Sequence, residues 1–216
     1  MFQAAVPCQD AAAGHSLGGA DEGREDDPVM PYSDMLLRDA VPEDAMAVAG
    51  VHVRSWQTAY RKLLPDDYLD RLRPEERAAR YDFASLDPCA PRTIVAAAGN
   101  LIQGFATISP SRDADLEGYG ELCALYVDPE YWGLGIGAAL ISAARGRLLE
   151  RGFRNAFLWV LVGNVRAERF YRIDGWTADG SHRTDSIWGS ALVNEMRYQR
   201  ILGAEARSPG KASARQ

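Results

Sequence analysis

The chain has 216 residues, of which 47% are apolar and 25% charged, a size and composition that suit one well-formed core but not two domains. The net charge is −6 and most of it lies in residues 1–34, so the remainder has no large basic field, which disfavours non-specific nucleic-acid binding. No apolar run approaches the ~20 residues of a membrane helix and the first residues lack a basic secretory start, so we expect a cytoplasmic protein without a membrane partner.

Both ends of the chain are predicted to be disordered tails. Residues 1–34 are rich in Ala, Gly and Asp, so they offer little to bury. Residues 203–216 look similar, which leaves one domain over residues 35–202. The three cysteines are too few and too widely spaced for a disulfide framework or a metal site, so we expect no metal. Cys123 lies in an apolar run and is expected to be a buried small hydrophobic residue.

The first half of the domain alternates strand-like and helix-like segments. Residues 35–38 form a short apolar strand candidate. Pro42 and the two acidic residues after it predict the start of a helix that runs to about residue 60, and two later Pro-acidic clusters predict shorter helices. Apolar stretches at residues 93–98 and 101–109 flank a Gly-Asn pair and predict a hairpin with a two-residue turn.

The second half is centred on an apolar strand at residues 121–127. A helix with one apolar face follows at residues 136–151, and a second apolar strand at residues 156–162, so we expect a parallel strand–helix–strand crossover. A short helix is predicted at residues 165–173. Two final antiparallel strands are predicted at residues 176–178 and 191–200. The fold class we expect is α/β (α+β), a mixed central β-sheet of about six to seven strands flanked by helices.

A glycine-rich turn, Trp132-Gly-Leu-Gly-Ile-Gly-Ala138, joins the central strand to its helix. Glycines at this place allow backbone N–H groups to surround a phosphate at a helix N-terminus. A nucleoside-triphosphate loop would need Gly-Lys-Ser/Thr, which is absent from this turn. A dinucleotide site would need an acidic residue at the end of the next strand, where none is found. A coenzyme A pyrophosphate site late in a small domain agrees with both facts.

Three stretches resemble the GCN5-related N-acetyltransferase (GNAT) superfamily. Residues 125–140, which run from the central strand into the following helix, are similar to its motif A. Residues 164–176, Asn-Val-Arg-Ala-Glu-Arg-Phe-Tyr-Arg-Ile-Asp-Gly-Trp, resemble the motif that follows it. Residues 53–60 together with 64–68 resemble the first helices of one bacterial branch. The resemblance covers roughly residues 35–200 and implies the GNAT fold, with acetyl-CoA as co-substrate.

The resemblance implies a role for each matching residue of the cofactor site. The backbone of Leu125, Tyr126 and Val127 would lie at a strand distortion and bind the pantetheine arm, and the N–H of Val127 would polarise the acetyl carbonyl. Asn164 would hydrogen-bond the pantetheine arm, cap the helix that begins after it, or do both. The pyrophosphate would be held by the glycine-rich turn, which comprises Gly133, Leu134, Gly135, Ile136, Gly137 and Ala138.

One position departs from the family pattern. The family usually has Gln or Arg where this chain has Trp132, and a tryptophan cannot make the same contact to a phosphate. Because the backbone donors of the glycines remain, we expect coenzyme A binding to be weakened and not lost.

The resemblance also suggests catalytic residues, each with a plain structural alternative. Tyr171 matches the tyrosine that often protonates the departing thiolate, but it could instead be a packed aromatic. Glu121 corresponds to a frequent family base, which would take the proton that an alkyl ammonium must lose, directly or through water; otherwise it is a solvated strand-end residue. Trp56 and Tyr60 lie four residues apart on the first helix and would line the acceptor pocket, or else pack in the core.

We therefore expect an N-acetyltransferase that moves an acetyl group from acetyl-CoA to a primary amine by direct attack in a ternary complex. The acceptor would be a small molecule or a peptide, and the sequence favours neither. Many relatives are dimers, so the resemblance is compatible with a homodimer. A different hypothesis is a non-catalytic acyl-CoA-binding or sensing module, which the departure at Trp132 supports; cofactor binding without turnover would favour it.

Overall fold

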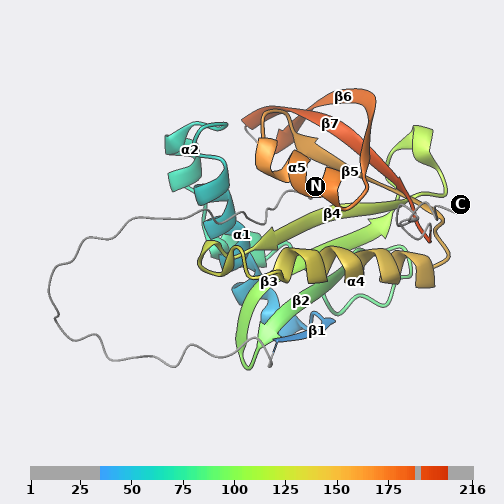
Figure 1. The fold of residues 1–216 in the computed structure, drawn as a ribbon. Helices are drawn as coiled ribbons and strands as arrows, with labels where there is room; N and C mark the ends of the chain where they lie inside the picture. Colours follow the sequence, from blue (N-terminus) through green and yellow to red (C-terminus); the bar gives the residue numbers. More distant parts are fainter. Residues whose placement is uncertain (1–34, 188–190, 204–216) are drawn as a thin grey trace, which may run out of the picture.

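The computed structural model describes residues 35–187 and 191–203, so the predicted tails lie outside the described residues, apart from Gly203. Seven strands form one mixed sheet in the order β1-β2-β3-β4-β5-β7-β6, which confirms the predicted sheet (Figure 1). Neighbours are antiparallel except for β4 and β5, which are parallel as the crossover predicted. The strands are β1 (Met35–Asp39), β2 (Arg92–Ala98), β3 (Leu101–Pro110), β4 (Gly120–Val127), β5 (Asn155–Leu161), β6 (Thr177–Ile187) and β7 (Ala191–Ile201).

Helices α1 to α4 begin where proline, acidic residues or glycine predicted a start, and α5 begins after Asn164. The first begins behind a 3₁₀ turn led by Pro42, where the missing proline N–H costs no hydrogen bond. Asp44, at the end of that turn, accepts hydrogen bonds from the Val41 N–H over 2.9 Å and from the Arg38 guanidinium over 2.6 and 2.9 Å, which ties the helix start to β1. The helices are α1 (Ala45–Ala59), α2 (Asp66–Asp70), α3 (Pro74–Ala78), α4 (Ile136–Glu150) and α5 (Val165–Ile173), and the 3₁₀ turns are η2 (Pro42–Asp44), η3 (Ala114–Leu116) and η4 (Pro129–Tyr131).

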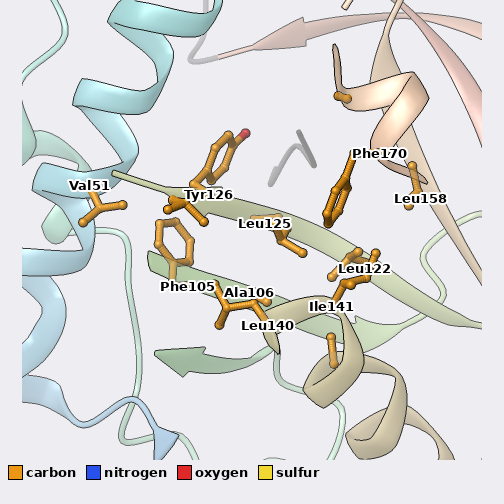
Figure 2. Close-up of a cluster of buried hydrophobic side chains, with 14 of the residues drawn as sticks. Val51, Phe105, Ala106, Leu122, Leu125, Tyr126, Leu140, Ile141, Leu158 and Phe170 are labelled. Carbon is orange, nitrogen blue, oxygen red and sulfur yellow. The ribbon is translucent and has the colours of Figure 1, made fainter. Parts of the chain in front are cut away.

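Helices α1 and α4 cover opposite faces of the central strands. Because side chains alternate along a strand, adjacent residues of β3 face different helices. Figure 2 shows Phe105 of β3 beside Val51 of α1, whereas the next residue, Ala106, lies beside Leu140 of α4. All four side chains are buried, so one continuous core runs through the sheet from helix to helix.

Strands β4 and β5 lie together at one end only. Their parallel pairing is limited to Gly120 with Ala156 and Glu121 with Phe157, and no pairing with β5 is assigned to the six residues of β4 after Glu121. Figure 2 shows Phe170 of α5 between these two strands, beside residues from each of them. The strands are therefore unpaired toward their carboxyl ends, next to the start of α4, and this unpaired stretch is called the opening below.

The strand distortion expected at residues 125–127 lies earlier in β4. The β3–β4 register passes from Thr107 opposite Ala124 to Ile108 opposite Leu122, so Cys123 is the extra residue. Its sulfur lies 3.1 Å from the Ser109 hydroxyl, and burial raises the pKa of the Cys123 thiol to about 12, with nearby Glu121 as a second cause. Cys123 is thus confirmed as buried, and the distortion does not reach the residues for which it was predicted.

Strand β6 is longer than the predicted strand at residues 176–178. It runs from Thr177 to Ile187, through an Asp-Gly-Ser stretch that is typical of turns. The β6–β7 register shifts between Ala178 and His182, and Gly180 takes a positive φ of 87° at that place. A bulge absorbs the turn-forming residues, and the strand resumes beyond them because its partner β7 continues to pair with it.

Candidate active site

The glycine-rich turn leaves backbone donors at the start of α4 without partners inside the helix. Gly133 and Gly135 have positive φ angles of 89° and 76°, and no side chain caps the helix. The first helical hydrogen bond runs from the Ala139 N–H to the Gly135 carbonyl over 3.0 Å. The preceding N–H groups, those of Ile136, Gly137 and Ala138, are therefore available to an anion at the positive end of the helix dipole.

The end of β4 presents backbone groups to the opening between β4 and β5. The N–H of Asp128 donates to the carbonyl of Gln103 in β3 over 2.8 Å. Because the backbone groups of successive strand residues point to opposite sides, those of Val127 and Leu125 point away from β3, toward the unpaired side. An extended ligand with amide groups could pair with this strand edge.

The carbonyl of Val127 is held by two side chains. It accepts a hydrogen bond from the Ser55 hydroxyl of α1 over 2.9 Å and another from the Trp132 indole N–H over 2.7 Å. Trp132, the residue that departs from the family pattern, thus makes an internal contact between the glycine-rich turn and β4. The two bonds hold this carbonyl in place, and the Val127 N–H points to the same side of β4, away from β3.

Asn164 caps α5 at the other side of the opening. Its side-chain oxygen accepts a hydrogen bond from the Ala167 N–H over 3.2 Å, so the capping alternative is confirmed. The side chain is buried, and its amide nitrogen has no partner among the described residues. The amide is therefore still able to donate to a ligand while its oxygen caps the helix.

Tyr171 is fully buried, and its hydroxyl has no hydrogen-bond partner within the described residues. Burial raises its pKa well above the ordinary tyrosine value, with Tyr126 and Asp174 as further causes. Burial also raises the pKa of Tyr60, and the causes that follow are its neighbours Tyr126, Tyr171 and Glu195. The hydroxyls thus lie near one another, protonated at neutral pH, and that of Tyr171 has an unmet bond to donate.

Glu121 is buried and clamped by Arg112. The guanidinium binds both carboxylate oxygens, over 2.9 Å from its Nε and 2.6 Å from one terminal nitrogen. This excludes the alternative of a solvated strand-end residue, since the Glu121 side chain is only 4% exposed. No contact joins Glu121 to Tyr171 in the described part of the chain, so the two predicted catalytic residues are not brought together directly.

Trp56 and Tyr60 pack in the core near this site. Both are 1% exposed, and their rings meet edge to face with centroids 5.1 Å apart. Trp56 also packs on His52, whose ring stacks on Tyr126. Tyr60 differs from Trp56 in that Tyr171 is among the groups that raise its pKa, after burial and Tyr126.

Sequence patterns did not indicate Glu195, although it is fully buried beside these hydroxyls. It is opposite Leu161 in the β5–β7 register, where β5 ends, and Arg183 of β6 donates to it over 2.7 Å. In the sequence Glu195 is a charged residue in an alternating strand, a pattern that indicates a solvent-facing position. The sequence alone could not show that Glu195 is buried, because a buried acid requires a partner and this partner, Arg183, lies on another strand.

Over residues 35–187 and 191–203, no helix is long and apolar enough to cross a membrane. The same residues contain no group of three or more His, Cys, Asp or Glu side chains placed to hold a metal ion.

Comparison with known proteins agrees with the geometry. The model of the acetyltransferase (GNAT) family matches residues 54–176. YuaI, an uncharacterised N-acetyltransferase of Bacillus subtilis (strain 168), is 36% identical over 131 residues, 60% of this chain and 73% of that protein.

Two solved structures share the fold. The PaiA N-acetyltransferase from Thermoplasma acidophilum in complex with coenzyme A has a TM-score of 0.61 and 19% identity, covering 77% of this chain and 98% of that one. The yncA structure from Salmonella typhimurium with its cofactor acetyl-CoA has a TM-score of 0.59 and 16% identity, covering 83% and 99%.

Proposed function

This chain belongs to the acetyltransferase (GNAT) family and is an N-acetyltransferase, and we propose that it transfers an acetyl group from acetyl-CoA to a primary amine by direct attack within a ternary complex. The observation that carries the proposal is the pairing of an uncapped glycine-rich helix start with an unpaired strand edge beside it. The first suits a diphosphate, and the second suits the amide-bearing arm that joins the diphosphate to the thioester. The coenzyme A and acetyl-CoA held by the two structural relatives support the same assignment.

The residues present suit the diphosphate, the arm and the sulfur of this co-substrate. The N–H groups at positions 136–138 would hold the diphosphate, the Asn164 amide and the backbone of residues 125–127 would hold the arm, and the orphan Tyr171 hydroxyl would meet the sulfur. When bound, acetyl-CoA supplies a thioester, whose carbonyl carbon is the electrophile and whose sulfur leaves as a thiolate.

The chain would assist this chemistry at two atoms. The Val127 N–H would donate to the acetyl oxygen and stabilise the negative charge that develops there, and the carbonyl of the same residue is already held by Ser55 and Trp132. The Tyr171 hydroxyl would give its proton to the departing sulfur. Because burial raises the pKa of Tyr171, the phenol and not the phenolate is present at neutral pH, as a proton donor must be.

For the amine proton we propose Glu121. Its carboxylate is buried at the start of β4 and would attract an ammonium group. Arg112 already binds both oxygens, so the acceptor would have to compete with this guanidinium before its proton could be taken. Tyr60 and Trp56 would border the acceptor, with the Tyr60 hydroxyl as the polar contact.

A two-step experiment tests the function. Binding of acetyl-CoA would first be measured by calorimetry and by the shift in thermal midpoint, with NAD as the control ligand; a specific ligand must raise the midpoint by mass action. Release of free thiol would then be followed with small primary amines and with peptides carrying a free N-terminus or lysine. Binding without turnover on any amine would replace the transferase by an acyl-CoA-binding module, and no binding would remove the cofactor assignment.

A further inference from the structure

A cavity of about 270 Å³ lies between the carboxyl-terminal half of α4 and the end of β7 (Figure 1). Its lining combines positive charge, a hydroxyl and apolar surface. The side chains concerned are those of Arg145 and Arg200, of Ser142, and of Leu149 and Leu202. None of these residues belongs to the glycine-rich turn or to the opening between β4 and β5, so the cavity is a second place where a ligand can be considered.

The two arginines of this cavity share one carboxylate. A terminal nitrogen of Arg145 and one of Arg200 lie 3.4 Å from different oxygens of Asp174, the residue that follows α5. The indole N–H of Trp176 donates to the same carboxylate over 3.0 Å. Two positive charges therefore face one negative charge, which leaves this cluster with an excess of one positive charge.

Both guanidinium groups also have unmet hydrogen bonds. The Nε of Arg145 and one terminal nitrogen of Arg200 are buried and have no hydrogen-bond partner over residues 35–187 and 191–203. Their 3.4 Å separations from Asp174 exceed the roughly 2.7–2.9 Å of a strong charge-assisted hydrogen bond. Burial lowers the pKa of Arg200, and the charge of Arg145 lowers it further. A second anion, met by a small turn of these long side chains, would offset the repulsion and accept the unmet hydrogen bonds.

The lining of the cavity indicates which kind of anion fits. One carboxylate balances an excess of one positive charge, whereas a phosphate dianion would leave the cluster negative. The planar fork of a guanidinium matches the two oxygens of a carboxylate. Leu149 and Leu202 offer apolar surface beside the charges, and Gly146 leaves room, because a Cβ there would have nothing within 4 Å. These features suit an acid with one carboxylate and a short apolar body.

We propose that this cavity binds a small organic monocarboxylate, with its carboxylate between Arg145 and Arg200 and its apolar body on Leu149 and Leu202. The site is separate from the proposed coenzyme A site. Arg145 follows Ile136, the first residue of α4, by nine positions, which at about 1.5 Å per residue is about 14 Å along the helix. The acid would therefore bind without displacing acetyl-CoA.

Calorimetric titration of the full chain with butyrate tests the proposal, with butyramide as the neutral analogue and a buffer free of other carboxylates and of phosphate. Butyrate should bind and butyramide should not. Arg145→Gln and Arg200→Gln should each weaken butyrate by at least about 10-fold, the effect of losing a hydrogen bond to a charged group. Arg145 is the more exposed of the two, with 25% of its side chain exposed against 14%, so its variant keeps the test usable should Arg200→Gln fail to fold.

Arg147→Gln is the matched control. It removes a positive charge from the same helix, but the Arg147 guanidinium is paired with Asp39 and Glu150 and does not line the cavity. This variant should bind butyrate as the unmodified chain does. An equal loss in Arg147→Gln would mean that butyrate responds to the net charge of the chain, which overturns the proposal.

Other outcomes would also overturn the proposal. If butyrate does not bind the unmodified chain, or if butyramide binds equally well, the two arginines recognise no carboxylate. Tighter binding of inorganic phosphate, lost in the same two variants, would replace the carboxylate by a different class of ligand. Competition between butyrate and coenzyme A would place butyrate in the proposed cofactor site. Failure of the chain to bind coenzyme A would instead count against the proposed function and leave the butyrate result standing.

Discussion

The indole N–H of Trp132 donates to the carbonyl oxygen of Val127. The hydroxyl of Ser55, on α1, donates to the same oxygen. Trp132→Phe removes one of two donors and should lower stability by about 1 kcal/mol, or about 2–4 °C in thermal midpoint. Ser55→Ala should cost a similar amount. The double variant should cost more than the sum, because only then is the buried carbonyl left unsatisfied. Additive losses of unfolding free energy in chemical denaturation would show instead that the two hydrogen bonds contribute independently.

Tyr171→Phe separates catalysis from binding and from folding. We expect kcat to fall by about 10²–10⁴-fold, the usual contribution of a general acid, while the affinity for acetyl-CoA is retained. The thermal midpoint should stay the same or rise, because the substitution removes a buried hydroxyl that has no partner among the described residues. Steady-state kinetics beside a thermal scan would check all three; unchanged kcat would take Tyr171 out of the mechanism.

Glu121→Gln tests the proton acceptor through its pH profile. The variant should lower kcat/KM for the amine at neutral pH by about 10²-fold or more. The deficit should shrink as pH rises toward the amine pKa of about 10.4, because the neutral amine then needs no base. Glu117→Gln, an exposed acid on the neighbouring loop, is the matched control and should have no effect. Parallel pH profiles for Glu121→Gln and the unmodified chain would exclude Glu121 as the base.

Helix α4 packs closely against β3 at Gly104, which has no side chain. A Cβ there would lie 2.9 Å from the Tyr126 carbonyl oxygen, 3.1 Å from Leu140 and 3.3 Å from Ile136. Gly104→Ala should therefore destabilise the fold by about 1–3 kcal/mol and, since Ile136 begins α4, should weaken coenzyme A binding as well. Gly146→Ala on the same helix meets nothing within 4 Å and should stabilise by about 0.5–1 kcal/mol. If both variants behave alike in denaturation and binding, the close approach has no consequence.

His52 should make stability depend on pH. Burial lowers its pKa well below the ordinary value, and the neighbouring Arg77 adds to this. As pH falls below about 6.5, the unfolded chain binds a proton that the folded chain refuses, so stability should decline. Above that pH the contribution is fully present. Urea unfolding at pH 7.5 and pH 5.5 would measure the decline, which should be smaller in His52→Gln; an identical pH slope in the variant would assign it to other groups.

Much of the fold could be predicted because local rules and tertiary structure agree. Gly152, with a φ of 90°, follows the end of α4, and the two-residue turn between β2 and β3 pairs Ala98 with Leu101, as the Gly-Asn signal indicated. The resemblance then implied that the turn at residues 132–138 and Asn164 bind one cofactor, which stays a prediction. Where a local signal conflicted with the sheet, as at Asp179-Gly180, the ladder with β7 prevailed and the strand prediction was too short.

The rest depended on contacts between distant segments. Arg112 binds Glu121 from a loop, Arg183 neutralises Glu195 from another strand, and Arg166 lies on Trp132 from another helix. No sequence pattern indicates which distant residue each arginine contacts, because periodicity reports local structure and not the reach of a long side chain. The residue types of the site could be listed in advance, but which charges are already occupied could be learned only from the structure.

The short parallel pairing of β4 with β5, here called the seam, has a consequence for how long the protein survives in the cell. Two residue pairs connect one half of the sheet to the other along this seam, and Phe170 of α5 lies between the two strands. Under the proposed function, acetyl-CoA would contact both halves of the sheet, so a high acetyl-CoA concentration would stabilise the folded seam. A cell short of acetyl-CoA would leave it open to proteases more often, and the abundance of the enzyme would then follow the supply of its own donor.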